Sequence, residues 1–204
     1  MRCSLRNEMK KAGNTKQKIV STAWKLFYQQ GYENTTVEDI IKESGTSKGS
    51  FYHYFEGKDS LLSTLSDLFD EKYVEIMQSV DPDMNSVDLL VYLNKTLFAV
   101  VEETVAIELL QRLLATQLIT AGEKHLLNRN RTYFKVLRQV ITQGQEKGEI
   151  TREISVNRIM KAYAMMERGL MYDWCISEGD YSLPAYSEEI MKKFCEQYRV
   201  ASSK

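Results

Sequence analysis

The residue types best suited to binding a partner gather between positions 47 and 58. Lys48, Gly49 and Ser50 follow one another where a short helix is expected to begin. A DNA major groove about 12 Å wide admits a helix but leaves little clearance. Glycine permits a close approach, while lysine and serine side chains can reach base edges or phosphates. This cluster is therefore typical of the N-terminal end of a helix that reads DNA.

Two short helices and a tight turn would position these side chains. Thr36 is a natural N-cap, and Asp39 three residues later resembles a capping box, so a first short helix is expected to begin there. Gly45 tolerates the positive φ of a turn, and a second short helix begins at Ser47 or Lys48. Two helices joined in this way form a helix-turn-helix. Their packing contact is predicted to come from Ile40, Ile41 and Phe51.

Flanking helices complete a three-helix domain. A helix over about residues 15–30 is expected to present one apolar face, made of Ile19, Ala23, Leu26 and Phe27. A longer helix is expected to start near Lys58, just after Gly57. The boundary between this domain, residues 1–60, and a larger one, residues 61–204, is placed inside that longer helix.

A pattern with matched spacing extends over more than forty residues, from Ile19 to Leu61. Its positions are Ile19, Ala23, Leu26, Phe27, Gly31, Tyr32, Thr35, Thr36, Val37, Ile40, Gly45, the run from Ser47 to Phe55, Lys58 and Leu61. This pattern resembles the N-terminal domain of the tetracycline-repressor (TetR) family of transcriptional regulators, and residues 143–150 resemble a common end to that family's seventh helix. Ile41 and Thr46 stand where the family often has Ala and Val, which concerns the packing of the two short helices.

The resemblance implies a fold, a partner and an activity. The fold would be all-α, with a three-helix helix-turn-helix DNA-binding domain followed by a larger helical domain for ligand binding and dimerisation. The protein would be a homodimeric repressor that an unknown small-molecule effector releases from a palindromic double-stranded DNA operator. A constitutive or architectural DNA-binding protein without an effector, or an activator, are the alternatives. No cofactor is expected.

The residues predicted to contact DNA are Thr36, Ser47, Lys48, Gly49, Ser50, Tyr52, His53 and Lys58. Thr36 either only caps its helix or also touches a phosphate, and Ser50 either caps its helix or contacts a base. The family pattern makes Tyr52 a phosphate contact. His53 is expected to contact the DNA backbone, and Lys58 to hold a phosphate beside the exposed amides of a helix start.

Charge is distributed unevenly although the net charge of the chain is −1. Residues 1–60 carry 10 Lys and Arg against 7 Asp and Glu, whereas the remainder carries 17 against 21. A basic end on a near-neutral chain suits a partner with negative charge, such as the phosphate backbone. Many basic runs are simply solvated, so the charge supports this interpretation without deciding it.

The sequence lacks the residue patterns that catalysis or metal binding would require. The two histidines, His53 and His125, belong to the helix-turn-helix and to an expected surface loop, so no catalytic constellation and no metal site is predicted. Cys3, Cys175 and Cys195 are far apart and form no C-x-x-C pair, which favours idle thiols. The chain shows neither a signal peptide nor an apolar run of about 18 residues. A cytoplasmic protein that is not an enzyme and has no membrane partner is expected.

The second domain is predicted to be helical throughout, with helices at about 86–103, 105–120, 126–147, 155–178 and 184–200. The 155–178 helix carries two adjacent apolar faces, one with Met160, Tyr163, Glu167, Met171 and Trp174 and the other with Ile159, Ala162, Met166 and Leu170. Two such faces predict burial on most sides. By the resemblance, the last two helices form a four-helix bundle with those of a second copy.

Glu167 is the charged residue on this apolar stripe, and a buried carboxylate needs a partner. A salt bridge to an arginine of another helix or subunit is the favoured partner, and a cationic or hydroxylated ligand is the alternative. Apolar and aromatic stripes line pockets when the space is not filled. The candidate ligand-binding residues are Tyr133, Phe134, Tyr163, Met166, Glu167, Met171 and Trp174.

Overall fold

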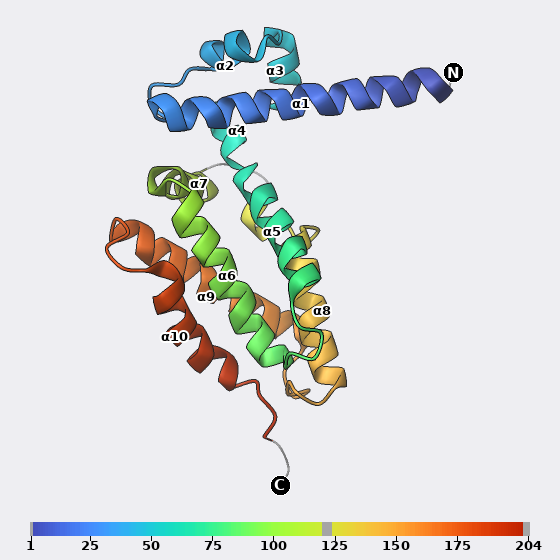
Figure 1. The fold of residues 1–204 in the computed structure, drawn as a ribbon, viewed down its shortest axis with the longest axis vertical. Helices are drawn as coiled ribbons and strands as arrows, with labels where there is room; N and C mark the ends of the chain where they lie inside the picture. The colour runs from blue at the N-terminus through green and yellow to red at the C-terminus, as the bar shows by residue number, and fades with distance from the viewer. Residues whose placement is uncertain (1, 120–123, 202–204) are drawn as a thin grey trace. The chain divides into compact units, whose positions relative to one another are not determined.

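The computed structural model describes the backbone of residues 2–119 and 124–201, and the side chains of residues 15–119 and 124–201. The chain divides into two compact units, Met1–Leu65 and Ser66–Lys204. The described residues form helices and no sheet; Ile150 and Arg199 make an isolated antiparallel bridge. The predicted all-α fold is therefore confirmed (Figure 1).

The first unit contains α1 (Arg2–Gln30), α2 (Val37–Ser44), α3 (Lys48–Tyr54) and α4 (Lys58–Leu62). Apolar residues four apart place Ile19, Ala23 and Phe27 on one face of α1, and all three are buried. Ile40 of α2 and Phe51 of α3 are fully buried as well, and α1 is in contact with both helices. The core of this unit thus fixes α2 and α3 against α1 (Figure 1).

The predicted start of the first helix near residue 15 was wrong, because α1 begins at Arg2. Residues 2–14 are mostly Arg, Lys, Leu, Met, Glu and Ala, which have high helix propensity. Their sequence lacks the apolar periodicity from which the helix was predicted, so helix propensity alone would have been needed to predict this part of α1. Cys3 and the basic side chains before residue 15 lie outside the described side chains.

The long helix predicted from Lys58 is divided into α4 and α5 (Leu65–Ser79). The amides of Ser63 and Thr64 donate to carbonyls only three residues earlier, as in a 3₁₀ turn. Their hydroxyl groups donate to the same two carbonyl oxygens, each at 2.6 Å. Serine and threonine hydroxyls that bond nearby carbonyls in this way compete with the regular helix, which explains the break.

The second unit contains, after α5, the helices α6 (Ser86–Thr104), α7 (Ile107–Ile119), the 3₁₀ turn η1 (His125–Leu127), α8 (Thr132–Glu146), α9 (Val156–Ile176) and α10 (Leu183–Glu196). Helices α6 and α10 form its most extensive helix pair, and α9 packs against α7, α8 and α10. Position 120, the predicted end of the helix now seen as α7, lies outside the described residues.

The predicted start of α8 near residue 126 was wrong, since α8 begins at Thr132. The Oδ1 atom of Asn128 accepts a hydrogen bond from the amide of Asn130 at 2.9 Å. An asparagine side chain that bonds the backbone two residues on forms an Asx turn. This turn and η1 therefore occupy the stretch where helix was expected.

Helix α9 is buried along one broad side only, and the prediction of burial on most sides was wrong, because Met165, Tyr172 and Ile176 on its other side are more than half exposed. Its buried residues are Ile159, Met160, Tyr163, Ala164, Glu167, Leu170, Met171, Trp174 and Cys175. Ala162 and Met166 of the second predicted face are half-buried. Full burial of one face and partial burial of the next makes α9 the central element of the larger unit.

Candidate nucleic-acid interface and ligand groove

Local interactions fix both ends of α2, the helix that precedes the turn. The Thr36 hydroxyl accepts from the Asp39 amide at 3.1 Å, and the Asp39 carboxylate accepts from the Thr36 amide at 2.9 Å. This is the capping box that the sequence predicted. The Thr36 side chain lowers the pKa of Asp39 by donating a hydrogen bond to its carboxylate. At the other end of α2, Gly45 has φ 59°, a left-handed conformation that favours glycine.

Helix α3 is held from its N-cap and from its buried side. The Ser47 hydroxyl accepts from the Ser50 amide at 3.1 Å and lies 2.9 Å from the Ser50 hydroxyl. Phe51 is fully buried, and Phe55 just after the helix is buried too. These contacts determine which side of α3 faces outward.

The outward side of α3 carries Lys48, Gly49, Tyr52 and His53, all of them exposed. A Cβ atom added to Gly49 would come no nearer than 4.0 Å to another part of the protein, the Ser47 hydroxyl. The interior of the unit therefore does not require glycine at this position. Its missing side chain instead leaves room on the outward side of α3.

Two of the lysines predicted to contact DNA differ in their surroundings. Lys48 lies 3.7 Å from the Glu38 carboxylate, and both side chains are about 70% exposed. An ion pair this exposed is easily exchanged for a phosphate. Lys58 is half-buried; its ammonium donates to the Tyr32 carbonyl at 2.7 Å and lies 4.2 Å from the centre of the Tyr32 ring. The structure thus shows Lys58 joining the start of α4 to the segment after α1.

In the second unit Glu167 is almost fully buried and lies among neutral donors. Its carboxylate accepts from Tyr133 at 2.5 Å, from the Asn94 amide at 3.0 Å and from Tyr73 at 3.3 Å. Within the described chain no Lys or Arg lies within ion-pair distance, so the favoured salt bridge is replaced by hydroxyl and amide groups. Burial raises the pKa of Glu167, and these hydrogen bonds partly oppose the shift.

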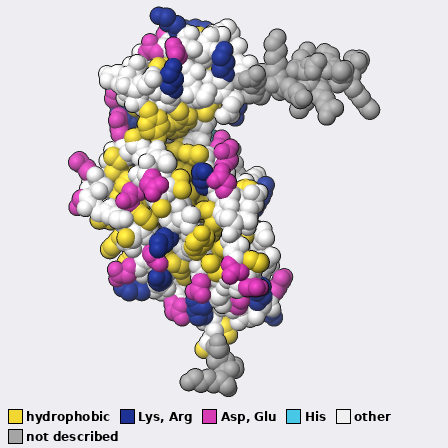
Figure 2. Space-filling view, viewed as in Figure 1, with side chains coloured by type: hydrophobic (Ala, Val, Ile, Leu, Met, Phe, Trp, Pro, Cys, Tyr) yellow, Lys and Arg dark blue, Asp and Glu magenta, His cyan; other side chains and the backbone are white. Residues whose placement is uncertain are grey.

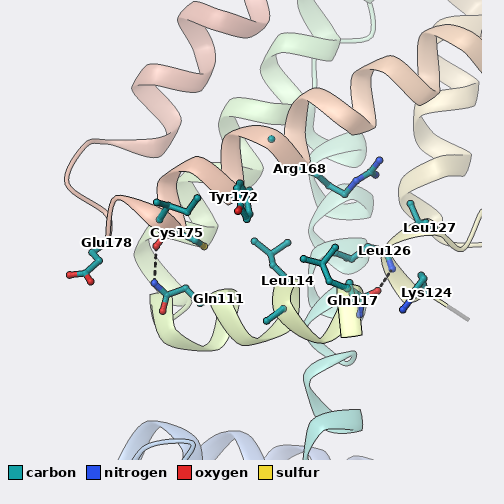
Figure 3. A pocket seen from close by; sticks show the side chains of 14 residues that line it. Gln111, Leu114, Gln117, Lys124, Leu126, Leu127, Arg168, Tyr172, Cys175 and Glu178 are labelled. Atoms are coloured by element: carbon teal, nitrogen blue, oxygen red, sulfur yellow. Dashed lines mark hydrogen bonds between the residues drawn. The ribbon is translucent and has the colours of Figure 1, made fainter. Parts of the chain in front are cut away.

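A groove of about 620 Å³ opens between α7, η1 and α9 (Figure 3). Its walls are mainly apolar, from Leu114, Leu118, Leu126, Leu127, Tyr172 and Ile176. The side chain of Gln111 donates to the Cys175 carbonyl at 2.7 Å, and that of Gln117 accepts from the Leu126 amide at 3.2 Å. These two bonds tie α7 to the other two walls. Lys124, Arg168 and Glu178 supply the charged groups of the lining.

A smaller cavity of about 40 Å³ lies in the same unit, between α5, α6, α8 and α9. It shares Leu126 and Arg168 with the groove. Its lining includes the cluster residues Tyr73, Tyr133 and Glu167. The groove and the cavity are thus neighbouring spaces with a common wall.

The candidate ligand residues are distributed unevenly around these spaces. Tyr133, Glu167 and Met171 line the small cavity, and none of the seven lines the groove. Tyr163 donates to the Leu90 carbonyl at 2.7 Å, and Trp174 donates to the Tyr181 carbonyl at 2.9 Å, so both complete the packing of the unit. Phe134 is buried against Tyr133, and Met166 is half-buried.

Sequence reasoning missed the groove because its residues come from three separate elements. A signal was present in Leu118, which is 78% exposed at the end of α7, and in Tyr172 and Ile176 of α9, which are 54% and 62% exposed. The face of the larger unit seen in Figure 2 likewise shows apolar side chains between charged ones. Helical periodicity places such residues on faces, but only the packing of helices shows that the faces enclose a groove.

Comparison with known proteins agrees with this geometry. Residues 19–65 match bacterial regulatory proteins of the tetR family, and residues 69–196 match the C-terminal region of YsiA-like proteins. The chain belongs to the TetR family. Its first unit carries the helix-turn-helix of such regulators. No helix among its described residues has the length and apolarity to span a bilayer.

Individual relatives of this TetR-family chain show how far the likeness extends. The HTH-type transcriptional regulator YxaF of Bacillus subtilis is 37% identical over 91 residues, which are 43% of this chain and 48% of that protein. The chain thus matches about half the length of this relative.

Solved structures extend the fold comparison to both units. Thermus thermophilus FadR, a TetR-family repressor in complex with lauroyl-CoA, has a TM-score of 0.72 at 18% identity, covering 92% of this chain and 98% of that one. Bacillus subtilis FadR in complex with stearoyl-CoA has a TM-score of 0.66 at 18% identity, covering 88% and 96%. At this identity the likeness shows the fold of the TetR-family chain.

Proposed function

We propose that this TetR-family chain is a homodimeric repressor that binds a palindromic operator through α3 and leaves it when an effector binds in the groove. The observation that carries the DNA-binding part is the division of α3 into two sides. Phe51 is fully buried, while Lys48, Gly49, Tyr52 and His53 face outward. A helix with small and basic residues on its free side meets the requirements of the major groove.

A dimer is supported by apolar side chains that the larger unit leaves exposed. Met165 of α9 is 56% exposed and Tyr186 of α10 is 46% exposed. Burial of such side chains against a second copy would stabilise an isologous two-fold pair. Two recognition helices related by two-fold symmetry would contact half-sites about 34–36 Å apart, which is one turn of DNA.

An acyl-CoA is the effector class that the groove favours. The long apolar wall suits an acyl chain, and Lys124 suits phosphate groups. Arg168 forms no ion pair or hydrogen bond with the described residues, so its guanidinium group can donate to an oxygen atom of the ligand. The FadR structures with the same fold hold lauroyl-CoA and stearoyl-CoA.

Release would follow from a shift between two states of the dimer. One state separates the two α3 helices by the distance that the operator requires, and the other does not. An effector shifts this balance only to the extent that it binds the second state more tightly. The ratio of its two affinities therefore limits how far DNA binding can be weakened.

Fluorescence anisotropy of a labelled operator duplex tests this proposal. Titration with lauroyl-CoA is expected to release the protein, whereas coenzyme A without an acyl chain is not. Leu118→Glu places a charge on the exposed apolar wall and is expected to abolish release without loss of DNA binding. Val74→Glu, an exposed apolar residue outside the groove lining, is the matched control. DNA binding that no acyl-CoA alters would support a constitutive regulator instead.

A further inference from the structure

The small cavity beside the groove has the chemistry of a receptor for one polar group. Glu167 is buried at its wall, and its hydrogen-bond donors, Tyr73, Tyr133 and Asn94, are all neutral. A carboxylate has about four sites that accept hydrogen bonds, and three are used here. The Tyr163 hydroxyl also lies beside this carboxylate, but it donates to the Leu90 carbonyl at 2.7 Å, which leaves a site that can accept from a ligand.

A second buried acceptor lies beside this carboxylate. The Asn94 side chain is fully buried and donates its amide hydrogen to Glu167. Its Oδ1 atom has no hydrogen-bond partner among the described residues. A buried acceptor without a partner costs free energy, and such groups are rare in native proteins. Asn94 lies beside Glu167 but is not part of the cavity lining, so Glu167 is the buried acceptor that the cavity itself presents.

Arg168 adds a donor that lacks an acceptor. It follows Glu167 in the chain and lines both the cavity and the groove. None of the described residues forms an ion pair or hydrogen bond with its guanidinium group. Arg131, the other arginine at the cavity, is paired with Asp70 at 2.8 Å and is neutralised by it. The cavity lining thus combines a buried carboxylate with a half-buried guanidinium group that has no partner among the described residues.

We propose that this cavity binds a hydroxyl group carried by an effector whose apolar body lies in the groove. The inference rests on the proposed function, because it takes the groove as the effector site. A hydroxyl both donates, to Glu167, and accepts, from Arg168. A cavity of about 40 Å³ admits one group of that size, since a water needs roughly 10–15 Å³ of the same measure.

Charged groups fit this cavity less well than a hydroxyl. An ammonium group would meet Glu167 favourably but would lie against the unpaired Arg168. A carboxylate would meet Arg168 favourably but would lie against Glu167. Like charges at close range oppose binding in a site of low dielectric. A neutral group that donates and accepts avoids both conflicts, and this selects alcohols over amines and acids.

Two isomeric probes distinguish recognition of the hydroxyl group from apolar binding in the groove. Decanol and nonyl methyl ether contain the same atoms, but only the alcohol can donate a hydrogen bond. Isothermal titration calorimetry with the full chain is expected to show decanol binding about tenfold or more tightly, as one hydrogen bond to a charged acceptor provides. Equal affinities, or no binding of either probe up to their solubility limits, would overturn the proposal. This comparison needs no variant.

Two variants test whether Glu167 is the group that causes decanol to bind more tightly than the ether. Glu167→Gln keeps the size of the side chain and removes its charge, and it is expected to reduce the preference for the alcohol to about threefold or less. Glu178→Gln changes the carboxylate of the groove lining, outside the small cavity, and is expected to leave the preference unchanged. A preference that Glu167→Gln leaves intact would place the hydroxyl elsewhere and overturn the assignment.

Failure of this inference is distinguishable from failure of the proposed function. Release of the operator by lauroyl-CoA without any preference for decanol would leave the repressor proposal standing and reject the hydroxyl site. A preference for decanol that depends on Glu167, in a chain that binds no operator, would support the hydroxyl site and reject the repressor.

Discussion

The two units fix their functional side chains over very different distances in the chain. In the first unit, bonds that span three residues cap α2 and α3, as between Thr36 and Asp39 and between Ser47 and Ser50. In the second, bonds to Glu167 span 34, 73 and 94 residues, to Tyr133, Asn94 and Tyr73. The surface proposed to bind DNA is thus built locally, whereas the site proposed for a small molecule is built by tertiary packing.

The two regions also differ in exposure. Lys48 and Tyr52 are exposed, so their charges and hydroxyls are in contact with water before a partner binds. Glu167 is buried, so its interactions act in a medium of low dielectric. Substitutions on the free side of α3 should therefore change binding with little effect on the fold. Substitutions at Glu167 should change folding and binding together.

The largest effect is expected from Phe51→Ala, which removes the buried side of α3. Loss of a fully buried phenylalanine typically costs about 3–5 kcal/mol. Chemical denaturation should show this loss, and DNA binding should disappear with it. Tyr52→Ala, on the free side of the same helix, should lower stability by less than about 0.5 kcal/mol. Equal stability losses for the two variants would mean that α3 is not anchored as described.

Gly49→Ala should separate DNA binding from folding. A methyl group at this position meets nothing closer than 4.0 Å, and alanine favours a helix, so the melting temperature should not fall. The methyl group would lie between α3 and the DNA, and affinity should fall about tenfold, or about 1.4 kcal/mol. Gly169→Ala, also in a helix with open space, is the control and should bind DNA normally. Normal binding by Gly49→Ala would show that clearance is not its role.

The pH dependence of stability should reveal the buried carboxyl group of Glu167. Burial raises the pKa of Glu167 above the ordinary 4.5 that the unfolded chain has. Below about pH 4.5 both states hold the proton, and above it the unfolded state releases its proton first, so rising pH favours unfolding. Glu167→Gln removes this dependence. Its melting temperature minus that of the wild type should therefore increase from pH 4.5 towards neutrality, and a constant difference would contradict the assignment.

The smallest effect is expected from Glu38→Gln. The Glu38 carboxylate lies 3.7 Å from the Lys48 ammonium and adds negative charge beside the surface proposed to meet phosphates. Its removal should raise DNA affinity about twofold to threefold at low salt, and the gain should vanish as salt screens the charges. Glu33→Gln, an exposed acid that precedes α2, supplies the comparison. A loss of affinity would indicate that Glu38 orients Lys48.

Sequence patterns predicted the first unit better than the second because its functional side chains are positioned by residues close to them in the chain. Caps, a left-handed glycine and an apolar face are local properties, so α2, the turn at Gly45 and α3 were predictable. The break at Ser63 and Thr64 was not, because hydroxyl groups that bond a helix carbonyl leave the apolar periodicity intact. Burial of one side of α9 followed from its periodicity, whereas the neutral partners of Glu167 come from helices distant in the chain.

The groove could not be predicted from helical periodicity. Arg168 and Tyr172 lie on α9 outside the apolar stripe and read in the sequence as ordinary surface residues. Their role in the lining depends on how α7 and η1 pack against that side of α9. The family resemblance supplied the expectation of a ligand but not the residues that would hold it.

Selection of bound duplexes from a random DNA library, at low and at moderate salt, tests the central claim most directly. The account predicts a palindrome with half-sites one helical turn apart and an affinity that falls steeply with salt. The same selection with Lys48→Ala should give weaker binding, and the salt dependence of log affinity should decrease by about 0.9 for each phosphate that the variant no longer neutralises. Recovery of no common sequence, with weak binding even at low salt, would contradict the claim that α3 reads an operator.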